Sequence, residues 1–248
     1  MYSSTERCPV GYCFAEDESA FAYQPPRIVI EGRQRPAGAR AIQNCPAVNS
    51  LERQLIELPS PVNLRLRMKI AGPGKAEIGV VQKGTFVEPA RLQKMLTLAP
   101  PPAWPHPQRP LLQLRLPYFF VTDDAAMASM LPPFFTSAMR RWPGLMQPER
   151  WPLSIWPQDL IWTLEWQDPD GELQLKQGEP LGYLHLEFNR PDKRPDLVEA
   201  ALTPALAEYR AGMDQVEAIT DQIEEIWDTA GTRRPARLLT PLDETADA

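Results

Sequence analysis

The segment VNLRLRMKI, residues 62–70, decides the fold class of this chain. Its apolar residues alternate without a break with Asn63 and three cationic side chains, and a period of two is typical of a β-strand with one buried face. The turn sequence GPG follows at residues 72–74, and residues 77–81 form a second strand-like segment. We therefore expect an antiparallel hairpin and, around it, a fold rich in β-structure.

Further strands are predicted on both sides of this hairpin. Before it we expect strands at 27–31 and 54–58, and after it a strand at 111–121 that is interrupted at Pro117. Segments 160–167, 172–176 and 181–188 alternate or are strongly apolar, and tight turns (DPDG, QGEP) separate them, which predicts a three-stranded meander. Short helices are expected from Pro89 and, with Thr122 as N-cap, before Pro132.

The C-terminal third predicts one long amphipathic helix over residues 204–230, with Thr203 as N-cap and Pro204 in the first turn. Its opposite face is acidic, and Gly231 is expected to end it. Gly212 weakens the isolated helix by about 1 kcal/mol, so that the apolar stripe must pack on something. The surface on which the stripe packs is either the chain's own sheet or a second chain. The stripe consists of Leu206, Tyr209, Met213, Val216, Thr220, Ile223 and Trp227.

These elements predict an α+β fold: a mixed or antiparallel sheet core with short helices and the long C-terminal helix. Residues 1–25 are expected to be an irregular arm, 26–230 a single globular domain and 231–248 a disordered tail. Proline accounts for 29 of 248 residues, against a usual share of about 5%. Six of these prolines lie in the segment 99–110, which is either a domain linker or, as we favour, a strap within one domain.

The net charge of −6 and the isoelectric point near 5.1 argue against binding to nucleic acid or to anionic membrane surfaces. Neither a signal peptide nor an apolar stretch of membrane-spanning length is evident. The three cysteines, Cys8, Cys13 and Cys45, contain no C-x-x-C pair. We therefore expect a cytoplasmic protein with reduced thiols and no bound cofactor.

Two groups of residues are candidates for a small-ligand site. His185 and Glu187 are two apart on one strand face and form, with His106, the only set that matches a two-histidine, one-carboxylate iron centre. Arg65, Arg67 and Lys69 share a strand face and are a candidate anion site. For each group the alternative is structural: a half-buried histidine in the first case and a solvated row of ion pairs in the second.

No nucleotide-binding loop and no nucleophile elbow occurs in the chain. The preferred interpretation is a non-enzymatic structural or interaction protein that contacts a partner, or a second copy of itself, through the C-terminal helix. The alternative is a small-molecule enzyme or binding protein that uses one of the two sites above. The candidate interaction residues are Tyr209, Met213, Val216, Ile223 and Trp227.

Five fragments carry a resemblance to a known family: NCPA at 44–47, SPVNL at 60–64, LPYFF at 116–120, LPPF at 131–134 and GEPLGY at 178–183. Together they resemble a family of uncharacterised proteins encoded by tailed bacteriophages, including those of cyanobacteria. The resemblance implies no activity. It implies a viral setting, with the chain either a virion component or an accessory protein in the host cytoplasm.

Overall fold

The computed structural model describes residues 6–15, 23–31, 45–134, 136, 142–220 and 222–245, which form three β-sheets and several short helices. The α+β class is therefore confirmed. The first sheet has the order β14 (Lys193–Glu199), β1 (Glu6–Phe14), β7 (Leu111–Val121), β11 (Asp159–Trp166) and β9 (Gly144–Met146), with β6 (Leu96–Leu98) also paired to β7. The second has the order β10 (Glu149–Pro152), β8 (Ala126–Leu131), β13 (Pro180–Phe188), β3 (Leu55–Pro59) and β2 (Arg27–Ile28). The third has the order β12 (Glu172–Leu175), β4 (Leu64–Gly72) and β5 (Lys75–Val80).

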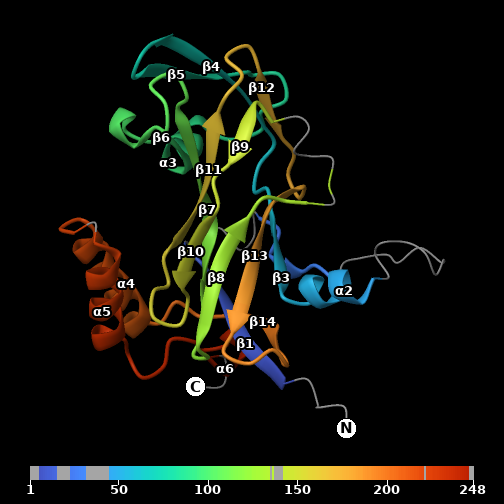
Figure 1. Ribbon diagram of the computed structural model, residues 1–248, viewed down its shortest axis with the longest axis vertical. Coiled ribbons are helices and arrows are strands. Elements are labelled where there is room, and N and C mark those ends of the chain that lie inside the picture. Colours follow the sequence, from blue (N-terminus) through green and yellow to red (C-terminus); the bar gives the residue numbers. More distant parts are fainter. Residues whose placement is uncertain are drawn as a thin grey trace.

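One apolar core joins the three sheets. It contains Val10 and Phe119 from the first sheet, Ile56 and Leu184 from the second, and Leu66 from the third. Figure 1 shows β4, β5 and β12 at one end of the molecule, while α4 and α5 lie against one side of the two larger sheets. Because burial of apolar surface is the main favourable term in folding, this shared core holds the sheets together.

The segment 62–70 behaves as its pattern predicts. Leu64, Leu66 and Met68 of β4 are buried, while the cationic residues between them point to the other face. β4 pairs antiparallel with β5 through a turn in which Gly74 has a φ of +68°, a conformation that glycine adopts without steric cost. The predicted hairpin is confirmed.

The predicted three-stranded meander is wrong, although its three strands are present. β11 pairs with β7 and β9, β12 pairs with β4, and β13 pairs with β3 and β8, so that consecutive strands enter three different sheets. An alternating pattern identifies a strand and its buried face, but the pattern carries no information about which strand lies next to it. Tight turns between strands therefore did not fix their pairing here.

The N-terminal residues are not an irregular arm throughout, because residues 6–14 form β1. β1 pairs in parallel with β14 and antiparallel with β7. Cys8, Val10 and Cys13 are buried along it, and Ala15 donates its amide to the Pro117 carbonyl at 2.8 Å. The structure thus incorporates this segment into the centre of the first sheet; residues 1–5 and 16–22 lie outside the described part.

The segment after Thr122 forms strand β8, whereas a helix was expected. Thr122 acts locally as predicted for a capping residue, since its hydroxyl accepts the Asp124 amide at 3.2 Å, but it also donates to the Pro9 carbonyl. Ala126, Ala128 and Met130 are buried between β10 and β13. Tertiary pairing on both sides has overridden the intrinsic helix preference of these alanine and methionine residues.

The short helix predicted from Pro89 is confirmed as α3 (Pro89–Met95), and α2 (Pro46–Glu52) is an additional helix. The proline-rich segment lies between β6 and β7, which pair antiparallel with each other. It contains one 3₁₀ turn, η2 (Pro101–Ala103), and the buried Trp104 indole donates to the Ala99 carbonyl at 2.8 Å. The segment is therefore the rigid loop of a β-hairpin.

The predicted single helix over 204–230 is wrong: the chain forms α4 (Pro204–Glu217) and α5 (Ile223–Arg233), which pack against each other. Gly231 lies inside α5 and does not end it. The tail is also ordered as far as Thr245, because Leu238 and Leu239 are buried and α6 (Leu242–Thr245) follows. Because the segment is divided into two packed helices, both halves contact the body.

Candidate functional site

The three residues of the predicted metal site lie on different parts of the fold. His185 and Glu187 are on β13, with the imidazole Nδ1 3.9 Å from a carboxylate oxygen, and Glu187 also accepts a bond from Arg150 at 2.6 Å. His106 lies in the proline-rich loop, where its Nδ1 accepts the Gln108 amide at 3.1 Å. No group of three potential metal-ligating side chains is present among the described residues.

The cationic row on β4 is bound to carboxylates of neighbouring strands. Arg65 and Arg67 both donate to Glu172 on β12, at 2.6 and 3.2 Å, and Lys69 lies 3.7 Å from a Glu77 oxygen on β5. Hydrogen bonding from Arg65 lowers the pKa of the Glu172 carboxyl, which keeps it charged. The row therefore matches the structural alternative of cross-strand ion pairs.

The buried cysteines are poor nucleophiles. Burial raises the pKa of the Cys8 thiol to about 11 and that of the Cys13 thiol to about 12. Because only the thiolate attacks electrophiles, both groups are inert near neutral pH. Cys45, at the start of α2, is exposed.

Residues 206–213 of α4 and residues 226–230 of α5 are fixed to the body by apolar and polar contacts, and we call this part the base of the helical pair. Leu206, Tyr209 and Met213 of α4 are buried in the core, and so are Ile226 and Ala230 of α5. The Tyr209 hydroxyl lies within hydrogen-bonding distance of the Ala230 carbonyl (2.8 Å) and of the Ile155 carbonyl. Two predicted interaction residues, Tyr209 and Met213, thus pack on the chain's own body.

Arg210 adds an electrostatic anchor at the same base. It donates to Asp159 at 2.5 Å and to the Pro157 carbonyl at 3.0 Å, and its guanidinium carbon lies 3.6 Å from the centroid of the Phe119 ring. A guanidinium over an aromatic face is a favourable cation–π contact. Arg210 therefore holds α4 to β7 and to the start of β11, two adjacent interior strands of the first sheet.

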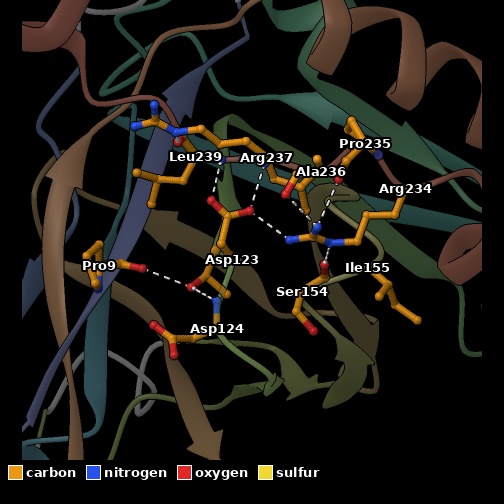
Figure 2. Close-up of polar contacts among 12 residues, drawn as sticks. Pro9, Asp123, Asp124, Ser154, Ile155, Arg234, Pro235, Ala236, Arg237 and Leu239 are labelled. Carbon is orange, nitrogen blue, oxygen red and sulfur yellow. Dashed lines mark hydrogen bonds and ion pairs between the residues drawn. The ribbon is translucent and has the colours of Figure 1, made fainter.

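A carboxylate in the turn between β7 and β8 fixes the segment that follows α5. Figure 2 shows Asp123 between Arg234 on one side and the backbone of residues 237–239 on the other. It accepts from Arg234 at 2.7 Å and from the Leu238 amide at 2.8 Å, and Arg234 also donates to the Ser154 carbonyl at 2.6 Å. We call Asp123, Arg234, Leu238 and Leu239 the C-terminal clasp. Arg233, Arg234 and Arg237 form a basic run in an otherwise acidic C-terminal region, and this run is the sequence signal that could have indicated the clasp.

The other end of the helical pair points away from these anchors, and we define residues 218–220 and 222–223 as the hairpin tip. Ile219 is 86% exposed and Ile223 is 38% exposed. The Thr220 hydroxyl donates to Glu225 at 2.9 Å and accepts the Gln222 amide at 3.2 Å. The tip therefore presents isoleucine to solvent.

Exposed acidic residues occur along both helices. Arg210 is the only basic residue in 204–230, and it is already bound to Asp159. The remaining predicted interaction residues are placed differently: Val216 and Trp227 are partly buried against the core, and only Ile223 is exposed. The exposed acidic residues of the two helices are Glu208, Asp214, Glu217, Glu224, Glu225 and Asp228.

Comparison with family models, curated proteins and solved structures found no match to this chain. In the part of the chain that the structure describes, no helix has the length and apolar character needed to cross a bilayer.

Proposed function

We propose that this protein is a non-enzymatic interaction protein that docks on a basic protein surface through the hairpin tip. The observation that carries the proposal is Ile219, an isoleucine 86% exposed at the apex of a helical pair whose base is firmly anchored. A large apolar side chain that is exposed to water is a typical anchor for a partner pocket. Because both helices are anchored to the body, the ordering cost of binding is reduced.

The charge around the tip defines the partner. Among the exposed acidic residues of α4 and α5, Glu224 and Glu225 directly follow Ile223, while Glu217 accepts a hydrogen bond from the Trp156 indole at 2.8 Å and the others lie further along the two helices. Two copies of this chain that met tip to tip would bring these carboxylates together, and like charges at an interface oppose association. A partner with lysine or arginine around an apolar notch is complementary in both respects.

The state of the reactive groups supports a role without catalysis. The thiols of Cys8 and Cys13 are held protonated, and Arg65 and Arg67 are bound to one carboxylate. His185 has a lowered pKa because of burial, and its carboxylate neighbour Glu187 is engaged by Arg150. The bacteriophage resemblance adds a setting to the proposal: such docking would occur within a virion or in the cytoplasm of the infected cell.

The proposal is tested by calorimetric titration with a synthetic amphipathic helical peptide that carries lysine on one face and leucine on the other. Wild-type protein is expected to bind it, with an affinity that falls as salt is added. Ile219→Ser should weaken binding about tenfold or more, since burial of an isoleucine side chain is worth about 1.5–3 kcal/mol and each 1.4 kcal/mol is a factor of ten.

The matched control is Leu145→Ser, which removes another exposed apolar side chain, 53% exposed on β9, far from the helical pair in sequence. It should leave binding unchanged. Equal affinity of the wild type and the Ile219→Ser variant would mean that charge alone attracts the peptide, and this would refute the proposal. The same conclusion would follow if the wild type did not bind the peptide at all.

A further inference from the structure

A pocket of about 260 Å³ lies where four segments meet: β1, the turn after β2, the end of α2 and the start of β14. Three arginines line it, and we call it the arginine pocket. Its walls are apolar, from Ile28 and Ile30 at the turn and Pro195 on β14. The three arginines are Arg7, Arg53 and Arg194.

Two of these arginines are direct cross-strand neighbours. Arg7 and Arg194 occupy the same register position in the parallel pair β1–β14. Neighbouring strands lie about 4.8 Å apart, and residues in register point to the same face. Like charges placed directly opposite each other are destabilising. The arrangement therefore carries an electrostatic cost that a bound anion would relieve.

The described residues only partly neutralise this charge. Arg7 forms an ion pair with Asp196 at 3.0 Å, and Glu31 is the one carboxylate that lines the pocket. Arg53 forms no ion pair within the described part of the chain.

Arg194 is held in place by its own backbone surroundings. Its Nη1 donates to the Pro191 and Lys193 carbonyls, both at 2.7 Å. Its Nε is buried and has no acceptor among the described residues. A buried donor without an acceptor is rare in folded proteins. The guanidinium is thus positioned while part of its donor capacity stays unused.

From the register of Arg7 and Arg194, the unpaired Arg53 and the apolar walls, we infer that the arginine pocket binds the phosphate group of a small phosphomonoester. Guanidinium groups recognise tetrahedral oxyanions through paired, charge-assisted hydrogen bonds. The volume is slightly below the range of about 300–1,000 Å³ that is usual for drug-sized ligands, which favours a small molecule. Ile28 and Ile30 would contact the organic group of the ester.

The test is calorimetric titration of the full chain with phenyl phosphate and, separately, with inorganic phosphate. Both are expected to bind, and phenyl phosphate should bind more tightly because its ring contacts the apolar walls. Arg53→Gln should weaken both at least about tenfold, the effect of losing one charge-assisted contact. The matched control is Arg67→Gln, which removes an exposed arginine of β4 that is bound to Glu172 on β12. This variant should bind both ligands with the affinity of the wild type.

Three results would overturn the inference. The first is wild-type affinity in the Arg53→Gln variant, and the second is an equal loss in the Arg67→Gln control. The third is tighter binding of a single-stranded oligonucleotide than of phenyl phosphate, which would assign the pocket to a polynucleotide backbone. Inorganic phosphate that binds as tightly as phenyl phosphate would confirm the anion site and assign free phosphate as its ligand. Circular dichroism and the unfolding midpoint of each variant confirm that the substitutions leave the fold intact.

Discussion

Replacement of Asp123 by alanine should release the C-terminal segment locally. The carboxylate accepts a 2.7 Å bond from Arg234 and a 2.8 Å bond from the Leu238 amide, and the side chains of Asp123 and Arg234 are 40% and 19% exposed. A hydrogen bond to a charged group contributes about 1.5–3 kcal/mol, and a partly exposed ion pair adds about 0–1 kcal/mol. The substitution should therefore lower the free energy of opening this segment by about 2–3 kcal/mol.

The segment should still be bound most of the time in the Asp123→Ala variant. Leu238 and Leu239 are 1% and 5% exposed, and burial of each leucine side chain is worth about 1.5–3 kcal/mol. The variant is expected to fold normally but to open more often. A local opening of this kind is observed in native-state hydrogen exchange rather than in global unfolding.

The reporter for this opening is the Ala201 amide, which donates to the Thr240 carbonyl at 2.9 Å and is not altered by the substitution. Its exchange rate should rise about 30- to 150-fold, the factor that corresponds to 2–3 kcal/mol. Asp228→Ala, which removes an exposed carboxylate on α5, is the control and should leave this rate unchanged. An unchanged Ala201 rate in the Asp123→Ala variant, or the same acceleration in the control, would show that the clasp does not retain the segment.

Three further predictions concern single side chains. Burial raises the pKa of the Glu149 carboxyl to about 7, so that its contribution to stability is fully present below the unfolded value of 4.5 and is lost as the pH rises through about 7. In urea unfolding, Glu149→Gln should therefore stabilise the protein by about 1–3 kcal/mol at pH 8 and leave its stability unchanged at pH 4. Gly212→Ala should stabilise α4 by about 0.5–1 kcal/mol, because the new Cβ has no atom within 4 Å and alanine is the better helix former; a lower unfolding midpoint would contradict this. Iodoacetamide at pH 8 should alkylate the exposed Cys45 of the native protein but not Cys13, whose thiol has a pKa of about 12, and mass spectrometry of the modified peptides distinguishes the two.

Local sequence patterns predicted the strands well where one strand face is buried. β4 is the clearest example, since its period of two fixed both the strand and the side chains that enter the core. The pairing partners were not predictable in the same way. β1 lies beside β14, whose residues are 187 positions further along the chain, and β11, β12 and β13 enter three sheets although they are consecutive. Strand pairing depends on contacts between distant segments, which a local period does not encode.

For the candidate sites, too, the residues themselves are visible in the sequence, but their partners depend on the fold. The cations of β4 are evident in the sequence, but Glu172, the counterion of Arg65 and Arg67, lies more than one hundred residues further on, so that this neutralisation could not be predicted from the row itself. The arginine pocket was missed for the same reason. Arg7, Arg53 and Arg194 come from three distant segments, none of which has a local motif. Only the fold brings their charges together.

The C-terminal helices show how a correct pattern can give a wrong element. Leu206, Tyr209 and Met213 are buried as their spacing predicts, yet beyond Val216 the buried residues are Ile226 and Ala230, and not Ile223 and Trp227. Both sets have four-residue spacing, so the sequence alone does not distinguish them. A straight helix over 204–230 would be about 40 Å long and would carry its second half past the body. The break allows that half to fold back with its other stripe inward, and it leaves Ile219 in the connecting turn, where no part of the described chain covers it. The same break that refutes the single helix therefore creates the exposed apolar anchor on which the proposed docking function depends.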